Sequence, residues 1–459
     1  MKDTRHRWNS EEENVAERAI VLVPDFHNTK NRHSGNGDPT DPGVANGLQI
    51  ERTLASRIEE ATGLARAISL NVVDALGVPV RNQRPATLFG KGKVEEIAAL
   101  IASKEAGLAI IDYAISPVQQ QNLEKAWNCK VLDRTALILE IFGERAQTRE
   151  GRAQVELAHL NYQKGRLVRS WTHLERQRGA LGFVGGPGET QIEADRRMIS
   201  DRINRLEKQL EKIQRTRTLH RAKRQKVPYP VVALVGYTNA GKSTLFNKVT
   251  GAKVFAKDLL FATLDPTLRQ LDLPDGTKVI LSDTVGFVSN LPTHLIAAFR
   301  ATLEEVIEAD LIVHIRDISD PDTGVQSRDV YQVMEQLGVN CDDDRRILEA
   351  WNKIDLLSEE QRDSINRLRT GQGGRREPLL ISSITGDGVD ALLSEIESRI
   401  SSRDNVLEIT LDVNSLGNLN WVYKHTRVLE REDREDGAVR LKLRANPDLV
   451  SEIMGMNSI

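Results

Sequence analysis

A short glycine-rich segment of this 459-residue chain has the residue types and spacing that hold phosphate groups. The run G-Y-T-N-A-G-K-S follows a buried-strand pattern at 231–235 and precedes a helical pattern at 245–249. Glycines let the backbone wrap closely around anionic oxygens, and N–H groups at a helix N-terminus point toward them. In such a loop Lys242 would neutralise the β- and γ-phosphate oxygens, and the Ser243 hydroxyl would ligate Mg²⁺. The segment predicts a nucleoside triphosphate site formed by Gly236, Tyr237, Thr238, Asn239, Ala240, Gly241, Lys242, Ser243 and Thr244.

Two later segments contain groups that would sense the terminal phosphate. Thr263 lies in the run F-A-T-L-D after the phosphate-binding helix, and it is the candidate to bind Mg²⁺ and sense the γ-phosphate. Asp283 ends a strand pattern and starts the run D-T-V-G, in which its carboxylate would hold Mg²⁺ and the Gly286 N–H would meet the γ-phosphate. The expected metal ligands are Ser243, Thr263 and Asp283. The expected nucleotide contacts are Phe261, Ala262, Thr263, Leu264, Asp265, Asp283, Thr284, Val285 and Gly286.

A third pair of segments has the groups needed to recognise a base. The run N-K-I-D follows a strand pattern at 347–351, and its Asp355 carboxylate can accept both N1–H and the exocyclic amine of guanine. Adenine offers no such pair of donors, so this position selects GTP. The run S-S-I, after another strand, would close over the base through its backbone N–H groups. The expected base-binding residues are Asn352, Lys353, Ile354, Asp355, Ser382, Ser383 and Ile384.

These segments follow one another in the order that a GTPase requires, each near the end of a predicted strand. Any one of them alone would be an ordinary turn, but their joint order is not expected by chance. Doubly wound sheets bind ligands outside the carboxyl ends of their parallel strands. We therefore predict that residues 227–402 form a P-loop GTPase domain with a doubly wound, mostly parallel sheet.

One position in this predicted site lacks a catalytic group. Many GTPases have a water-orienting glutamine after the D-x-x-G run, where this chain has Phe287, so we expect slow intrinsic hydrolysis. Asn239 either shapes the loop or, as in related potassium-dependent GTPases, helps to ligate a K⁺ ion that stabilises transition-state charge. Both interpretations stay open. The residues expected to act in catalysis are Thr263, Gly286, Lys242 and Asn239.

The charge of the chain is unevenly distributed. The formal net charge is -3, but residues 145–226 contain 20 Lys and Arg against 9 Asp and Glu, so this segment has +11 and the remainder -14. Apolar residues recur there at heptad-like steps, in two runs separated by a glycine-rich stretch at 178–188. We predict a basic antiparallel helical hairpin over 144–226. A solvated coiled coil and an arm for a polyanionic partner are the two alternatives, and the charge excess favours the arm.

The flanking segments predict two further domains. Residues 17–143 alternate between strand patterns, at 19–23, 67–73, 108–113 and 130–132, and helix patterns, which indicates a small α/β domain. We expect 1–16 to be disordered and 25–47 to be a flexible insert, since both are polar. Residues 403–459 contain a strand pattern, a helical stretch near Trp421 and a hairpin turn at Asp436-Gly437, which predicts a small α+β domain.

Composition excludes several other classes. Cys129 and Cys341 are the only cysteines, so a disulfide scaffold and a zinc ribbon are excluded. No apolar run approaches the ~20 residues that span a bilayer, and the N-terminus lacks the apolar core of a signal peptide. We expect a cytoplasmic monomer that does not insert stably into membranes.

Runs outside the phosphate loop carry a family resemblance. The chain resembles the HflX family, in the Obg–HflX group of translation-factor-related GTPases, over about residues 17–400. The tip LGFVGGPGE and the insert at 25–47 depart from the family pattern. The matching runs are LFGKGKVEEI (88–97), QQQNLEKAW (119–127), VLDRTALILEIFGERAQTREGRAQVELAHL (131–160), GGPGETQIEADRR (185–197), GYTNAGKSTLFN (236–247), FATLDPT (261–267) and DTVGFVSNLP (283–292).

The resemblance implies an activity and partners. It implies a Mg²⁺-dependent GTPase that binds the large ribosomal subunit and its RNA and splits or rescues stalled or idle ribosomes. It also implies ATP as a secondary substrate. The ribosome would then order the switch segments and activate hydrolysis. The alternative is a nucleotide-dependent switch whose basic hairpin docks a non-ribosomal RNA or a protein.

Overall fold

The computed structural model describes residues 17–26, 52–177, 187–224, 229–252, 260–261, 263, 266–289, 300–343, 345–370, 377–402, 405–413, 415–434, 436–445, 449–450 and 453–454. The chain forms two compact units, one of residues 1–207, 259–261 and 291–298, the other of the remaining residues. The predictions for 1–16, for 27–47 of the insert and for 178–186 of the tip lie outside the described residues.

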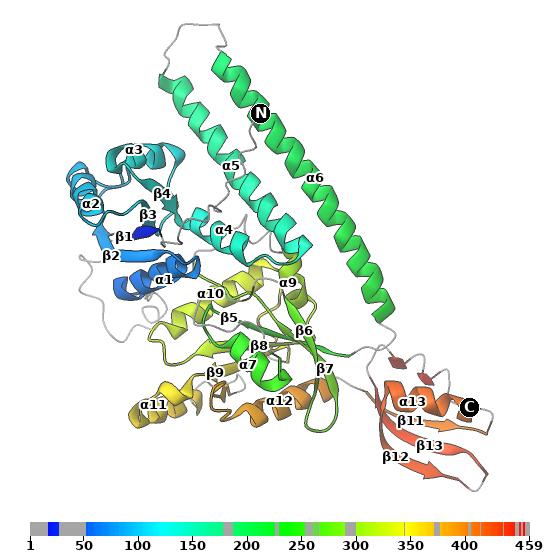
Figure 1. Cartoon of the computed structure of the whole chain (residues 1–459). Coiled ribbons are helices and arrows are strands. Elements are labelled where there is room, and N and C mark those ends of the chain that lie inside the picture. Colours follow the sequence, from blue (N-terminus) through cyan, green and yellow to red (C-terminus); the bar gives the residue numbers. More distant parts are fainter. Residues whose placement is uncertain are drawn as a thin grey trace, which may run out of the picture. The chain divides into compact units, whose positions relative to one another are not determined.

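A four-stranded parallel sheet organises the first unit. Its strands have the order β2-β1-β3-β4. The apolar runs of β1 and β3 are buried because helices pack against the sheet, and most of β2 is half-buried (Figure 1). A serine or threonine caps α1 and α3. The strands are β1 (Arg18–Asp25), β2 (Asn71–Pro79), β3 (Leu108–Ile111) and β4 (Lys130–Asp133). The helices are α1 (Leu54–Ala67), α2 (Lys91–Ser103), α3 (Pro117–Trp127) and α4 (Arg134–Arg145).

The strand predicted at 67–73 is wrong in its first half. Helix α1 continues to Ala67, and β2 begins only at Asn71. Residues of α1 up to Ala67 are buried at helical spacing. Tertiary packing therefore keeps this segment helical, although its local apolar run also fits a strand. Ser69, with a φ of 59°, then turns the chain toward the sheet.

Two long helices follow, α5 (Arg149–Gln177) and α6 (Pro187–Arg224), side by side in Figure 1. Among the apolar residues at heptad-like steps, Ala153, Ile203 and Leu206 are buried, and Leu157 is half-buried. Arg202 of α6 forms a 2.7 Å ion pair with Glu156 of α5, which ties the two helices together.

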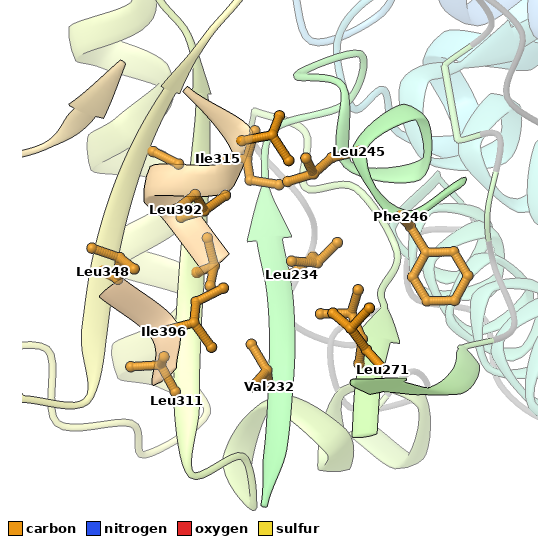
Figure 2. Packing of buried hydrophobic residues seen from close by; sticks show 14 of the residues in the cluster. Val232, Leu234, Leu245, Phe246, Leu271, Leu311, Ile315, Leu348, Leu392 and Ile396 are labelled. Atoms are coloured by element: carbon orange, nitrogen blue, oxygen red, sulfur yellow. The ribbon is translucent and has the colours of Figure 1, made fainter. Parts of the chain in front are cut away.

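The second unit contains a six-stranded sheet in the order β10-β9-β8-β5-β7-β6, parallel except for β6 at its edge. Figure 2 shows apolar residues of this sheet packed against Leu245 and Phe246 of α7 and against Leu392 and Ile396 of α12. The strands are β5 (Val231–Gly236), β6 (Thr267–Asp272), β7 (Lys278–Asp283), β8 (Leu311–Asp317), β9 (Ile347–Asn352) and β10 (Leu379–Leu380). The helices are α7 (Lys242–Thr250), α9 (Arg300–Ile307), α10 (Thr323–Gln336), η2 (Ile354–Leu356), α11 (Glu359–Thr370) and α12 (Val389–Ser401).

A small antiparallel sheet, in the order β11-β13-β12, ends the chain. The hairpin predicted at Asp436-Gly437 is present between β12 and β13, with Gly437 at a φ of 81°. Its elements are β11 (Asn405–Leu411), η3 (Leu416–Asn418), α13 (Leu419–His425), β12 (Arg427–Asp433) and β13 (Val439–Ala445). Among the helices that the structure describes, none is both long and apolar enough to cross a membrane.

Candidate nucleotide site

The phosphate loop joins β5 to α7 and closes around a buried lysine. The Lys242 ammonium donates a 2.7 Å hydrogen bond to the Tyr237 carbonyl, and burial lowers its pKa to about 8. Gly241 has a φ of 95°, and a Cβ there would lie 2.1 Å from Nδ2 of Asn352. Only glycine therefore fits at this position. Asn239 is exposed at the loop, with a φ of 60°.

The side-chain oxygens of Ser243, Thr263 and Asp283 lie within hydrogen-bond distance of one another, where the phosphate loop passes into α7. Ser243 Oγ donates to Asp283 Oδ2 at 2.7 Å, Thr263 Oγ1 donates to the same oxygen at 2.9 Å, and the two hydroxyl oxygens lie 2.9 Å apart. The other carboxylate oxygen, Asp283 Oδ1, is buried and has no hydrogen-bond partner within the described part of the chain. Burial raises the pKa of Asp283, while Ser243, Lys242 and Thr263 act in the opposite direction. This set of hard oxygen donors with an unpaired carboxylate oxygen fits Mg²⁺.

The D-T-V-G segment after β7 packs directly on the phosphate loop. A Cβ at Gly286 would lie 3.0 Å from Cα of Thr238 and 3.1 Å from Nζ of Lys242. Phe287 is almost fully buried, and its carbonyl accepts a 2.7 Å hydrogen bond from the Thr238 N–H. The Phe287 side chain is therefore part of the core and cannot orient an attacking water.

Side-chain bonds join the predicted base-binding segments to one another and to the phosphate loop. Asn352 Nδ2 donates to the Ala240 carbonyl at 2.8 Å, and Asn352 Oδ1 accepts from the Ser383 N–H at 2.9 Å. Ser382 Oγ donates to Asp355 Oδ1 at 2.6 Å, which orients the carboxylate that would meet the base. The phosphate segment and the predicted base-binding segments are therefore joined by side-chain hydrogen bonds.

The structure does not bring all the predicted nucleotide-binding residues together. Ala262, Leu264 and Asp265 lie outside the residues that the structure describes. Phe261 belongs to the first compact unit, where the centroid of its ring lies 4.8 Å from that of Phe142 of α4. Tyr237, Thr238, Ala240, Thr284 and Val285 are buried around the loop, Thr244 and Ile354 are half-buried, and Ile384 is exposed.

Sequence reasoning missed two residues of this site. Asp317, the last residue of β8, forms a 2.7 Å ion pair with Nζ of Lys353, which has a φ of 67°. Its place at the carboxyl end of a parallel strand could have indicated it. Lys248 of α7 donates a 3.0 Å hydrogen bond to the Ile384 carbonyl in the predicted base-binding loop, and no motif contains this lysine.

The sheet order, the phosphate loop and the base-selecting segments define a P-loop GTPase, an enzyme that binds GTP and hydrolyses it to GDP and phosphate. Enzymes of this class generally work with Mg²⁺. Four family models match the chain. They describe a GTP-binding GTPase N-terminal region (55–143), a GTP-binding GTPase middle region (145–224), a 50S ribosome-binding GTPase (231–353) and an HflX C-terminal domain (368–454).

Curated relatives extend this match over most of the chain. A GTPase HflX of Magnetococcus marinus is 49% identical over 389 residues, which cover 84% of this chain and 88% of the relative. A GTPase HflX of Escherichia coli is 40% identical over 402 residues, covering 86% and 92%. The chain belongs to the HflX family of GTPases. Among solved structures, a GTP-binding protein of Sulfolobus solfataricus in complex with GDP is 21% identical, with a TM-score of 0.43, covering 84% of this chain and 99% of that chain.

Proposed function

We propose that this GTPase binds the large ribosomal subunit through its basic helical hairpin and, in its GTP form, splits or rescues stalled or idle ribosomes. The observation that carries the proposal is the +11 charge of residues 145–226, 20 basic against 9 acidic. Phosphate contacts from such an arm supply strong, salt-dependent affinity for RNA. The basic residues of α6 that the structure describes as exposed include Arg196, Arg197, Arg202, Arg205, Lys208, Lys212 and Arg215.

The match to a 50S ribosome-binding GTPase model supports the same partner. The proposal places the protein in the cytoplasm and has it act as a monomer. Gel filtration of the full chain at micromolar concentration tests the monomer, since a dimer would elute at twice the mass.

We infer the following roles at the site. Ser243, Thr263 and Asp283 would hold Mg²⁺, which when bound neutralises charge on the β- and γ-phosphates. Lys242 neutralises the β- and γ-phosphate oxygens as well, and the Gly286 N–H donates to the γ-phosphate. During hydrolysis a water oxygen bonds to the γ-phosphorus as the bond to the bridging oxygen breaks, and Lys242 offsets the charge that moves onto GDP.

Because Phe287 is buried, this active site needs a further contribution to hydrolysis. One candidate is K⁺ ligated by the exposed Asn239, which would supply charge near the phosphates. Single-turnover hydrolysis in K⁺ and in Na⁺ at equal ionic strength tests it, and equal rates would exclude K⁺. The other candidate is the ribosome itself, which a titration of large subunits into a steady-state assay tests.

Cosedimentation with large subunits is the deciding experiment for the partner. We expect a pellet that depends on a non-hydrolysable GTP analogue and weakens steeply with salt. Replacing Arg196, Arg197 and Arg205 of α6 by Glu should reduce binding by roughly tenfold or more.

The matched control replaces Lys278, Arg328 and Arg345 by Glu, because these three are exposed in the GTPase unit and the change in charge is the same. Equal binding by both triple variants would contradict docking through the hairpin. Salt-sensitive binding to RNA that is not ribosomal, without a pellet on subunits, would favour the alternative switch function.

A further inference from the structure

Lys248 joins the phosphate-binding helix to the loop that follows β10. Its ammonium donates hydrogen bonds to two consecutive carbonyls of that loop, that of Ile384 at 3.0 Å and that of Thr385 at 3.3 Å. Lys248 lies in α7 six residues after Lys242, so both lysines extend from one rigid helix. The phosphate-binding element therefore holds the base-binding element directly.

The loop itself is closed by hydrogen bonds between its own residues. The Gly386 N–H donates to the Ser382 carbonyl at 2.8 Å, and the Ser382 N–H donates to the Asp387 carbonyl at 2.9 Å. The Thr385 N–H donates to Ser382 Oγ at 3.1 Å. Gly386 has a φ of 98°, and a Cβ there would lie 3.2 Å from Cε of Lys248, so the loop fits closely against the lysine. A contact at its tip therefore fixes the whole loop.

Two attachments hold this loop in different ways. Asn352 is buried and binds the Ser383 N–H, whereas Lys248 is exposed and binds the two carbonyls one and two residues further on. Between them, Ile384 has its carbonyl fixed while its apolar side chain is 70% exposed. An apolar side chain held at the rim of a base site can cover one face of a purine and exclude water.

We propose that Lys248 is a positioning residue that holds the base-binding loop closed over guanine and so slows nucleotide release. It acts through the loop, by fixing the carbonyls of Ile384 and Thr385. The two hydrogen bonds have a charged donor, but water competes for an exposed ammonium, so the expected effect is modest. Removing the ammonium should speed release of GDP by roughly threefold to tenfold.

The test is the dissociation rate of fluorescently labelled GDP from the full chain in Mg²⁺, chased with unlabelled GDP. Lys248→Met should release GDP roughly threefold to tenfold faster, and Lys248→Arg, which keeps charged donors, should stay within about twofold of the original chain. The control is Lys278→Met, which removes an exposed lysine at the amino end of β7, away from the strand ends that carry the site. It should leave the rate unchanged.

A second measurement separates loop positioning from damage to the phosphate helix. Lys248→Met should weaken GDP binding and leave the affinity for inorganic pyrophosphate unchanged, because pyrophosphate has no base for the loop to hold. Unchanged GDP release, or equal weakening of GDP and pyrophosphate, would overturn the proposal. Should Lys248→Met not fold, Lys248→Gln must still release GDP at least about twofold faster, and an unchanged rate there would equally overturn it.

Discussion

The two parallel sheets of this molecule use the carboxyl ends of their strands in opposite ways. In the GTPase sheet, Asp283 keeps one buried oxygen without a partner among the described residues, and Lys242 is bonded to a carbonyl. In the N-terminal sheet, Arg134 binds the carboxylates of Glu60, at 2.6 Å, and of Asp112. The first arrangement leaves charge for a ligand to satisfy, and the second uses its charges internally.

A further buried carboxylate of this unit bonds to helix α5. Asp133 at the end of β4 accepts a 2.9 Å hydrogen bond from the Tyr162 hydroxyl and forms a 3.1 Å ion pair with Arg166, both on α5. Burial and the nearby Asp133 raise the pKa of Tyr162, which therefore stays protonated as a donor. The same topology thus provides a ligand site in one unit and a fixed attachment for a helix in the other.

The strongest way to break this comparison is to remove the buried lysine of the GTPase site. Lys242→Ala should weaken GTP binding by roughly 1,000-fold, because no other group replaces a buried charge next to the phosphates. The fold of both units should persist, since the hydrogen bond that is lost goes to a backbone carbonyl. Titration with fluorescent GTP and circular dichroism check this, and Lys278→Ala is the control. A loss below about tenfold would show that the ligand charge is satisfied elsewhere.

A substitution in the ionic cluster of Arg134, Glu60 and Asp112 should change the free energy of unfolding and not the nucleotide affinity. Arg134→Met leaves Glu60 and Asp112 buried without their shared cation, so we expect a loss of about 3–5 kcal/mol in the free energy of unfolding. Denaturant unfolding of the full chain, followed separately from GDP affinity, measures it. GDP affinity at the second unit should not change. A loss under about 1 kcal/mol would mean that the cluster is not a closed ionic network.

A smaller loss of affinity is expected at Asp355, whose carboxylate already accepts a hydrogen bond from Ser382 and would also have to bind the base. Asp355→Asn loses the acceptor pair for guanine, so GDP should bind roughly 100-fold more weakly and the preference for guanine should shift. Competition of GDP against other nucleoside diphosphates tests this. Ser382→Ala, which removes the hydroxyl that orients Asp355, is the graded control and should lose less. Unchanged guanine preference in Asp355→Asn would refute the assignment.

The smallest expected effect concerns a buried histidine with neither a ligand nor a full charge partner. Burial lowers the pKa of His314 from 6.5 to about 4, so the ring is neutral at pH 7 although Glu349 lies 3.9 Å away. Because the folded-state pKa is depressed, its contribution to stability is complete above about pH 6.5 and is lost as the pH falls toward 4. Between pH 7 and 5 this loss should be about 2 kcal/mol.

His314→Gln should flatten that pH dependence. Denaturant unfolding of both chains at pH 7 and pH 5 gives the difference directly. Identical pH slopes would mean that His314 keeps its ordinary pKa in the fold.

Most of the GTPase fold could be predicted, because strand and helix patterns alternate along this part of the chain and most of the candidate segments follow a strand pattern. The strand predicted at 231–235 is present as β5 (Val231–Gly236), and the helical pattern at 245–249 lies within α7 (Lys242–Thr250). The class and the family are confirmed by the matches along the chain. The roles assigned to single residues stay predictions.

What could not be predicted depends on contacts between residues distant in sequence. Lys248 bonds a loop about 136 residues later, and Arg134 bonds Glu60, 74 residues earlier. Neither contact leaves a periodicity or a spacing in the sequence. The end of α1 at Ala67 was missed for a related reason, since tertiary packing decided between two local patterns that were both possible.

The unpaired carboxylate oxygen of Asp283 has a thermodynamic consequence. A buried polar atom without a hydrogen-bond partner destabilises a fold, so a bound Mg²⁺ that contacts this oxygen should raise the free energy of unfolding. By mass action, a ligand that binds the native state alone at 100 times its dissociation constant adds about 2.7 kcal/mol of stability. We therefore expect guanine nucleotide to raise the melting temperature of this protein, so that the folded fraction as well as the activity would follow the nucleotide concentration.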